Sequence, residues 1–387
     1  MKKLAIITTH PVQYYAPVFA LLHKRGKINI RAFYTWGESV AGKYDPGFNK
    51  KIEWDIPLLE GYPYEWVKNT SKEPGSHHFK GIINPDLISR ILLFKPDAVL
   101  VFGWAWQSHL KAMRYFKNRI PVYFRGDSTL LSGAVGIKKY CRLVFLRWVY
   151  KHADHAFYTG KNNKAYFLKH GFNETRLSFS PHAIDNARFH KKRAAEAAGL
   201  RLTLNLSDDE ILILYAGKFE AVKNLKLLLH AFINLNNKAT HLLLVGNGIE
   251  EGELKAFAGN IHIPRNIHFM GFQNQTYMPV LYQAADLFCL PSVSETWGLA
   301  VNEAMACGKA VLVSDRVGCA TDLVRNNYNG LIFKSNDLSG LTLCLRELTL
   351  SKRLLDEYGE NSWRIINDWN FGAIAAAIEN KLINETH

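Results

Sequence analysis

The chain has 387 residues, 48% hydrophobic and 21% charged, so it can form two α/β domains and is too apolar to be disordered or collagen-like. Its five cysteines include no CxxC pair, which argues against a cysteine metal site or a disulfide framework and favours a reducing cytoplasm. Lysine and arginine number 28 against 13 acidic residues in residues 1–185, but 20 against 21 in residues 186–387, so the first half is expected to meet an anionic partner.

Strand-like apolar runs alternate with helix-like segments along the whole chain. In the first half, strands are predicted over 4–8, 28–34, 98–102 and 121–124, and helices over 16–25 and 108–118. In the second half, strands are predicted over 211–216, 242–245, 267–269, 287–290 and 310–313. Continuous apolar strands between helices are typical of parallel sheets covered on both faces. Two such blocks predict an α/β fold of two doubly wound, Rossmann-like domains that face each other across a cleft.

The domain boundary is expected near residue 186. The stretch 186–201 is basic and polar and lacks a clear period, which is typical of a surface linker. We therefore expect a first domain over 1–186, a second over 187–365, and a C-terminal helix over 366–387 that packs back on the first domain.

The densest basic stretch, 136–158, interleaves cations with large apolar residues. As a helix it fits an element lying at a membrane interface, and equally a core helix with a solvated basic edge. Nucleic acid is disfavoured because the chain has no zinc-finger spacing, RNP-like motif or recognition-helix pattern. No apolar run approaches the ~18 residues needed to span a bilayer.

The most specific segment is 290–324, which carries Glu295 and Glu303 eight residues apart. A short loop is predicted to lead into a helix that begins near Gly298 and stops at Gly308. A helix start presents free amide groups and a positive dipole end, which bind phosphate. Two carboxylates at different depths suit the hydroxyls of two different sugar rings. The alternative, which is usual for a lone pair of glutamates, is that both are solvated surface charges.

Two further segments follow predicted strands. Lys218 comes directly after Gly217, and Lys223 opens the next helix, so the two cations can clamp a diphosphate, unless they are ordinary surface lysines. The run Val-Gly-Asn-Gly, with Gly246 as its first glycine, predicts a tight loop near a nucleotide.

In this order, the three segments resemble the retaining GT-B glycosyltransferases of family 4, the glycosyl transferases group 1. The C-terminal domain of that family reads GR…KG, VGxG and PSxxEGFGLxxxEAMAxGxPVV, and the resemblance covers roughly residues 205–335. It implies that Lys218, which stands where the family usually has Arg, and Lys223 hold the donor's pyrophosphate.

The resemblance also implies roles for the remaining residues of the donor side. Glu303 would bind the ribose hydroxyls, and Glu295 would orient the hydroxyls of the transferred sugar. The backbone amides of the helix start would meet the distal phosphate, and the base would be recognised after the strand at 267–269. The residues expected to bind the distal phosphate are Trp297, Gly298 and Leu299. Those expected to recognise the base are Gly271 and Phe272.

The first domain matches less well. The segment HPVQYY at 10–15, with His10 and Gln13, is similar to a subset of bacterial members that carry HPxQY there, and these two residues are expected on the acceptor side. Trp104 is a candidate acceptor platform and His109 a further polar candidate, although the alternatives are a core tryptophan and a satisfied helical histidine.

The strand at 121–124 is followed by Arg125, where many relatives place a histidine beside the sugar. A guanidinium cannot act as a general base, so Arg125 is expected to hold a phosphate or sugar oxygen, with Asp127 accepting a hydroxyl proton or hydrogen bond.

These expectations define a retaining glycosyltransferase that needs no metal or other cofactor, because lysines can neutralise the diphosphate of the nucleotide-sugar donor. A lipid-linked or glycan acceptor is expected, in surface polysaccharide or O-antigen assembly. The enzyme would then be cytoplasmic or peripheral on the anionic inner membrane face, and a monomer or weak dimer. The alternatives are a nucleotide-sugar 2-epimerase of the same fold and a non-enzymatic basic protein that binds membrane or nucleic acid.

Overall fold

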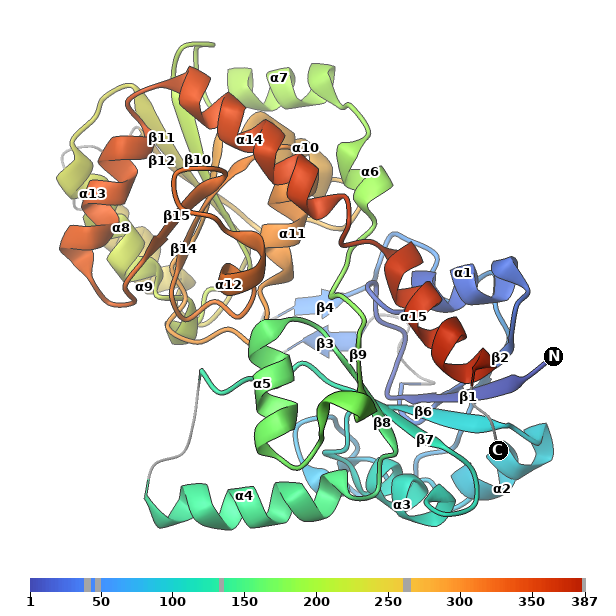
Figure 1. The fold of residues 1–387 in the computed structure, drawn as a ribbon. Coiled ribbons are helices and arrows are strands. Elements are labelled where there is room, and N and C mark those ends of the chain that lie inside the picture. The colour runs from blue at the N-terminus through green and yellow to red at the C-terminus, as the bar shows by residue number, and fades with distance from the viewer. Residues whose placement is uncertain (38–42, 46–49, 132–135, 260–265, 385–387) are drawn as a thin grey trace. The chain divides into compact units, whose positions relative to one another are not determined.

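The computed structural model describes residues 1–37, 43–45, 50–131, 136–259 and 266–384 (Figure 1). The chain forms two compact units, each built on its own sheet. Unit 1 comprises Met1–Ala41, Pro57–His182 and Phe371–His387, and unit 2 comprises Gly42–Ile56 and Ala183–Asn370.

Unit 1 contains a seven-stranded sheet in the order β5-β2-β1-β6-β7-β8-β9, in which every neighbouring pair is parallel. Its strands are β1 (Lys3–Thr8), β2 (Asn29–Tyr34), β5 (Tyr64–Trp66), β6 (Ala98–Phe102), β7 (Val122–Arg125), β8 (His155–Tyr158) and β9 (Leu177–Phe179). Its α-helices are α1 (Ala16–Arg25), α2 (Leu87–Phe94), α3 (Gln107–Phe116), α4 (Ile137–Tyr150), α5 (Lys161–Lys169) and α15 (Phe371–Ile383). Two 3-10 turns, η1 (Phe79–Gly81) and η2 (Glu174–Arg176), complete the unit.

The helices of unit 1 cover both faces of its sheet. Apolar side chains of α2, α3, α4 and α5 form one core with β1, β6 and β7. On the other face α1 packs beside α15, as Figure 1 shows in blue and red. Arg25 of α1 grips the buried carboxylate of Glu379 in α15 through two contacts, Nε to Oε1 at 2.9 Å and Nη2 to Oε2 at 2.8 Å. The C-terminal helix is thus part of unit 1.

Unit 2 contains a six-stranded parallel sheet in the order β12-β11-β10-β13-β14-β15. Its strands are β10 (Ile211–Ala216), β11 (Thr240–Val245), β12 (Ile267–Met270), β13 (Leu287–Leu290), β14 (Ala310–Ser314) and β15 (Gly330–Phe333). Its helices are α6 (Asn186–His190), α7 (Ala194–Thr203), α8 (Leu225–Leu235), α9 (Glu251–Gly259), α10 (Met278–Ala284), α11 (Leu299–Ala306), α12 (Ala320–Leu323), α13 (Leu338–Leu348) and α14 (Lys352–Ile366), with the 3-10 turn η3 (Ala221–Lys223). The antiparallel pair β3 (Lys43–Asp45) and β4 (Lys50–Ile52) also belongs to unit 2.

The strand predictions are confirmed, because each predicted strand overlaps an observed one and the central strands are fully buried apolar runs. The prediction of an irregular linker over 186–201 is wrong. Asp185 caps α6 by accepting a hydrogen bond from the backbone N–H of Arg188 at 3.1 Å, and the alanine-rich run after residue 193 forms α7. The boundary between the two domains was expected between residues 186 and 187. In the structure, the units divide between His182 and Ala183.

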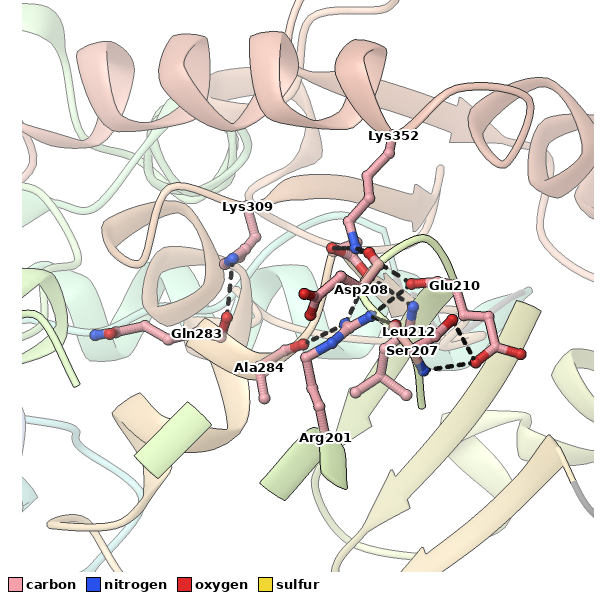
Figure 2. A network of polar contacts seen from close by, with 10 residues as sticks. Arg201, Ser207, Asp208, Glu210, Leu212, Gln283, Ala284, Lys309 and Lys352 are labelled. Carbon is pink, nitrogen blue, oxygen red and sulfur yellow. Dashed lines mark hydrogen bonds and ion pairs between the residues drawn. The ribbon is translucent and has the colours of Figure 1, made fainter. Parts of the chain in front are cut away.

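A polar network at the amino end of unit 2's sheet ties three helices to its strands (Figure 2). The carboxylate of Asp286, just before β13, accepts from Arg201 Nη1 of α7 at 3.1 Å and from the backbone N–H of Leu212 at 2.8 Å. Lys352 of α14 lies 3.4 Å from the same carboxylate, and Lys309 donates to the carbonyl of Gln283 at the end of α10. This network lies at the edge opposite the carboxyl ends of the strands and therefore holds the sheet together rather than facing a ligand.

Candidate functional site

Both sheets have a point where the strand order reverses, and ligands of open α/β sheets bind at the carboxyl ends of the strands there. In unit 2 this point lies between β10 and β13, because β11 and β12 follow on one side and β14 and β15 on the other. The two loops that leave it are joined by a hydrogen bond from the N–H of Val293 to the carbonyl of Val222, at 2.9 Å. Lys218 and Lys223 follow β10 and Glu295 follows β13, so these loops carry all three residues at the carboxyl ends of the strands.

Lys223 and Glu295 form an ion pair at this switch point, although they are 72 residues apart. Each side chain is 19% exposed. The Ser292 hydroxyl lies 3.5 Å from the same carboxylate oxygen, Oε2. The backbone of Glu295 is held on both sides, because its N–H donates to the carbonyl of Arg316 and its carbonyl accepts from the N–H of Gly318, each at 3.1 Å. The site therefore presents one ammonium and one carboxylate in fixed positions at the sheet edge.

Helix α11 begins directly after this pair. Gly298 precedes its first turn with φ of +96°, a left-handed conformation that favours glycine, and a Cβ there would crowd Val317 at 3.0 Å. Trp297 is buried and donates from Nε1 to Asn302 Oδ1 at 2.9 Å, which fixes the entry of the chain into the helix. The first turn, from Leu299, carries the positive end of the helix dipole.

Glu303 lies inside α11 and is 3% exposed, so it is not a solvated surface charge. The hydroxyl of Tyr282, in α10, donates to its Oε2 at 2.9 Å. A buried carboxylate requires such donors, because an unpartnered buried charge is costly. Tyr282 thus orients Glu303 and was not anticipated from the sequence, since the two residues meet only through helix packing.

The loops after β10, β11 and β12 pack tightly against one another. A Cβ on Gly246 would lie 1.9 Å from the carbonyl oxygen of Gly217, so only glycine allows this approach. The side chain of Asn247 links the next loop, because its Oδ1 accepts from the N–H of Phe272 at 2.6 Å, beside Gly271. The three glycines after adjacent strands, Gly217, Gly246 and Gly271, therefore line one edge of unit 2.

Lys218 follows Gly217 and is partly exposed. Its carbonyl accepts from the Tyr215 hydroxyl at 2.8 Å, which holds the backbone of the loop. Lys218 is the last of the residues predicted to bind the donor. The others described above are Lys223, Glu295, Glu303, Gly271, Phe272, Trp297, Gly298 and Leu299. All of them except Glu303 lie in loops or helix starts that follow β10 to β13, and Glu303 lies inside α11.

Unit 1 carries its polar candidates at the carboxyl ends of β1, β6 and β7. His10, after β1, contacts the Thr9 hydroxyl through Nδ1 at 2.9 Å and meets the ring of Trp36 edge-on at 5.4 Å. Gln13 is partly exposed, just before α1. Both residues lie beside the switch point of this sheet, between β1 and β6.

Arg125 does not extend toward a ligand. It is 1% exposed, and its guanidinium donates from Nη1 to the carbonyl and hydroxyl of Ser180, at 2.9 and 2.7 Å, and from Nη2 to the carbonyl of Pro181 at 2.8 Å. Arg125 was expected to hold a phosphate or sugar oxygen. In the structure its guanidinium instead binds the chain after β9 and fixes the position of that segment. The sequence pattern at one strand end cannot reveal that a second strand end takes up the guanidinium.

His109 and Trp104 are also committed to internal contacts. His109 is fully buried, donates from Nδ1 to the carbonyl of Gly103 at 2.9 Å, and meets the Thr35 hydroxyl at Nε2, also at 2.9 Å. Burial lowers the pKa of His109 to about 4, so it is neutral near pH 7. Trp104 donates from Nε1 to the Tyr150 hydroxyl at 3.2 Å and packs edge-on against Phe145. These contacts agree with the alternatives given for both residues, a hydrogen-bonded histidine within a helix and a tryptophan packed in the core.

His182 is a polar residue that the sequence analysis did not single out. Its side chain is 4% exposed and lies 3.8 Å from the carboxylate of Asp127, whose own side chain is 44% exposed. Tyr15 stacks over the His182 ring at 6.1 Å, and burial raises the pKa of the Tyr15 hydroxyl well above its ordinary value. Asp127 thus offers an exposed carboxylate backed by a buried imidazole, which only the return of the chain after β9 brings together.

Neither a metal cluster nor a membrane span is found in the part of the chain that the structure describes. No three His, Cys, Asp or Glu side chains there are grouped so as to hold a metal ion. None of the helices described combines the length and apolar character needed to cross a bilayer.

Comparison with known proteins shows a family match in unit 2. Residues 200–364 match the family described as Glycosyl transferases group 1. An uncharacterized glycosyltransferase of Methanocaldococcus jannaschii is 29% identical over 178 residues, 43% of this chain and 45% of that protein. The alpha-monoglucosyldiacylglycerol synthase of Streptococcus pneumoniae is 26% identical over 205 residues, 50% of this chain and 46% of that protein. The chain thus spans about half the length of the curated relatives it matches.

The fold of the whole chain is matched by a solved structure. Anabaena HepE in complex with UDP has a TM-score of 0.75 and 18% identity, with each chain covered over 100% of its length. At this identity the likeness concerns the fold, which is two Rossmann-like parallel-sheet units. Residues 200–364 are thus similar to the glycosyl transferases group 1, and the whole chain has the GT-B fold of two Rossmann-like units.

Proposed function

We propose that this chain is a retaining glycosyltransferase of family 4 that moves a sugar from a nucleotide-diphosphate sugar to an acceptor hydroxyl. The observation that carries the proposal is the switch point of unit 2, where Lys223 and Glu295 meet directly before the start of α11. Lys218, Lys223 and the amides of the first turn of α11 supply the positive charge that a diphosphate needs. HepE, a structural neighbour, is seen in complex with UDP, which supports a nucleotide-sugar donor.

The carboxylates take different roles because their surroundings differ. Glu303, buried and oriented by Tyr282, binds the ribose hydroxyls of the nucleotide. Glu295, partly exposed beside Lys223, orients the hydroxyls of the transferred sugar. Gly271 and Phe272 recognise the base, and Asn247 holds their loop in place.

The reaction breaks the bond between the anomeric carbon and the diphosphate oxygen, and the electron pair leaves with the diphosphate. The acceptor oxygen forms the new bond on the same face, and its proton passes to the departing diphosphate oxygen. Lys218, Lys223 and the start of α11 stabilise the charge that develops on that diphosphate. No metal is required in this scheme, so activity should survive treatment with a chelator.

Unit 1 is proposed to bind the acceptor. Asp127, exposed and backed by His182, accepts a hydrogen bond from the acceptor hydroxyl, and His10 and Gln13 lie at the same sheet edge. Arg125 positions this region through Ser180 and Pro181.

The acceptor is proposed to be a lipid-linked glycan at the inner face of an anionic membrane, in surface polysaccharide or O-antigen assembly. The first turns of α4 support this, because apolar and cationic side chains are exposed together. Ile137 is 81% exposed and Tyr140 68%, beside the exposed Lys138, Lys139 and Arg142. A helix of this composition binds the interface of anionic lipid. The relative from Streptococcus pneumoniae is named for a glycolipid product, which is consistent with an acceptor of this kind.

The donor is tested by thermal shift with UDP, GDP, ADP and their sugars, followed by release of the free nucleotide in the presence of acceptor. Stabilisation by one diphosphate series and acceptor-dependent release support the proposal. Conversion of the sugar nucleotide without acceptor would indicate an epimerase, and binding of polyanions without preference for sugar nucleotides would indicate a non-enzymatic protein. The anomeric configuration of the product, read by NMR, tests retention.

The membrane surface is tested by sedimentation with vesicles of phosphatidylglycerol and phosphatidylcholine. Each lysine near an anionic surface contributes about 1 kcal/mol, so the double change Lys138→Gln and Lys139→Gln should weaken binding roughly 30-fold. Lys24→Gln, on the exposed side of α1, is the matched control. Vesicle binding that is absent in the parent or unchanged in the double variant contradicts the membrane assignment.

A further inference from the structure

A short segment that lies early in the sequence belongs to unit 2. Gly42–Ile56 leaves unit 1 after β2 and returns to it before β5, yet it is part of the compact unit that contains β10 to β15. Nothing in its composition marks it as part of the donor-side unit. Its described residues Glu53, Trp54 and Asp55 contact the loop that follows β12.

This loop, residues 271–277, is held from several directions. Asn274 Nδ2 donates to the carbonyl of Glu53 at 2.6 Å. The N–H of Thr276 donates to the Asp55 carboxylate, at 3.2 Å from Oδ1 and 3.1 Å from Oδ2, and the Thr276 hydroxyl also donates to Oδ2. A carboxylate that receives both the amide and the hydroxyl of one residue fixes the position of that residue.

The opposite side of the same loop is tied to unit 2's own elements. The N–H of Phe272 donates to Asn247 Oδ1, and Arg188 donates from Nη2 to Gln275 Oε1 at 2.8 Å. The loop that carries Phe272 is therefore bound on one side by Asn247, in the loop after β11, and on the other side by Glu53 and Asp55. The Trp54 and Phe272 rings meet at 6.3 Å between centroids with an interplanar angle of 60°.

Both rings are partly exposed, and the neighbouring Gly271 is exposed. Two fixed aromatic rings at the carboxyl end of a strand, beside a residue without a side chain, leave π-surface available to a flat heteroaromatic ring. Such stacking strengthens the binding of a nucleotide whichever base it carries, because every base has a π-face.

We propose that Trp54 forms, with Phe272, the aromatic wall against which the nucleobase of the donor stacks. The inference rests on the proposed function, since it assigns a base-binding residue to the same donor site. Glu53 and Asp55 are positioning residues, because they hold Trp54 against the loop. A purely structural role for the segment would instead make Trp54 important for stability but not for binding of the base.

The experiment compares binding of UDP, GDP, ADP and inorganic pyrophosphate to the full-length parent and to four variants by isothermal titration calorimetry. Trp54→Ala should weaken binding of the nucleoside diphosphates about tenfold. Pyrophosphate has no base, so its affinity should not change. Trp54→Phe should retain most of the nucleotide affinity, because a ring remains. Tyr328→Ala, a 37% exposed aromatic elsewhere in unit 2, is the matched control and should behave as the parent.

The outcomes separate the inference from the function on which it rests. Unchanged nucleotide affinity in Trp54→Ala overturns the inference, as does an equal loss of nucleotide and pyrophosphate binding, which would indicate general destabilisation. If Trp54→Ala does not fold, Asp55→Asn still decides, because this change loosens the segment that holds Trp54: weaker nucleotide binding at unchanged pyrophosphate affinity supports the role, and unchanged nucleotide binding overturns it. A parent that binds none of the three diphosphates but folds normally overturns the proposed function itself.

Discussion

The ion pair between Lys223 and Glu295 allows a prediction in which two single changes act in opposite directions. In the structure the ammonium of Lys223 is already engaged by a carboxylate, in the place where a diphosphate is proposed to bind. Glu295→Gln removes a negative charge that competes for this ammonium and repels the incoming phosphates. Lys223→Met removes the ammonium and leaves the carboxylate. We expect the first change to tighten binding of inorganic pyrophosphate and the second to weaken it.

The size of both effects follows from burial and charge. Each side chain is 19% exposed, so the pair lies between an exposed pair, which contributes about 0–1 kcal/mol, and a buried one, where loss of one partner costs about 3–5 kcal/mol. Either change should therefore destabilise unit 2 by about 2 kcal/mol, which lowers Tm by roughly 4–8 °C for a unit of this size. Loss of a charge-assisted contact of about 1.5–3 kcal/mol should weaken pyrophosphate binding by Lys223→Met roughly 10- to 100-fold. Glu295→Gln should tighten it by roughly 3- to 10-fold while lowering turnover, because the sugar hydroxyls lose their acceptor.

Calorimetry with pyrophosphate and thermal melts of the same samples measure both quantities. Lys226→Met is the matched control, because Lys226 pairs with Glu253 in unit 2 at 2.6 Å but the two side chains are 47% and 63% exposed. That change should alter Tm and pyrophosphate affinity only slightly. The double variant should lose less stability than the two single losses combined, since the partners are coupled. If both single variants shift pyrophosphate affinity in the same direction, or if neither differs from Lys226→Met, the assignment of this pair to the diphosphate site is refuted.

Three further predictions concern residues whose partners are known from the structure. Tyr282→Phe removes the hydroxyl that donates to the buried Glu303; UDP affinity should fall about 3- to 10-fold with pyrophosphate affinity unchanged, and a parallel loss of both would argue against ribose binding by Glu303. Burial lowers the pKa of His109 to about 4 from 6.5, so on acidification the unfolded chain takes up the proton first, and the free energy of unfolding falls by about 3 kcal/mol between pH 6.5 and 4. In denaturant melts, the difference in free energy of unfolding between the parent and His109→Gln should narrow by that amount over this range. A difference that does not change with pH would contradict the prediction. Asp286→Asn weakens the contacts with Arg201 and the N–H of Leu212 and should lower the free energy of unfolding by about 2–4 kcal/mol, whereas an altered pyrophosphate affinity would show that this network is not confined to the amino end of the sheet.

The parallel strands and the loops that carry the site follow from local patterns. The runs that became β10 and β13 are apolar without interruption, and such runs are buried wherever they pack, so their identity does not depend on distant residues. Because ligands bind at the carboxyl ends of such strands, the positions of Lys218, Lys223 and Glu295 could be predicted as candidates. The glycine stop after α11 and the position of Glu303 inside that helix also come from local rules.

The hydrogen-bond partners of individual side chains could not be predicted in this way, because they depend on which strand ends and helices become neighbours. Arg125 reads as a free cation after a strand, but the chain after β9 supplies the carbonyls that bind its guanidinium. The sequence alone allows Glu303 to be a surface charge. In the structure, packing of α10 brings the hydroxyl of Tyr282 to its carboxylate.

The amino-acid sequence alone determined the α/β class, the strands and the order of the donor-side motifs, since periodicity and glycine spacing act over a few residues. Only the tertiary structure decided that Lys223 pairs with Glu295 and that Trp54 lies against Phe272. These partners are separated by tens to hundreds of residues, and their meeting is set by the packing of whole elements, for which no short segment of sequence carries the information.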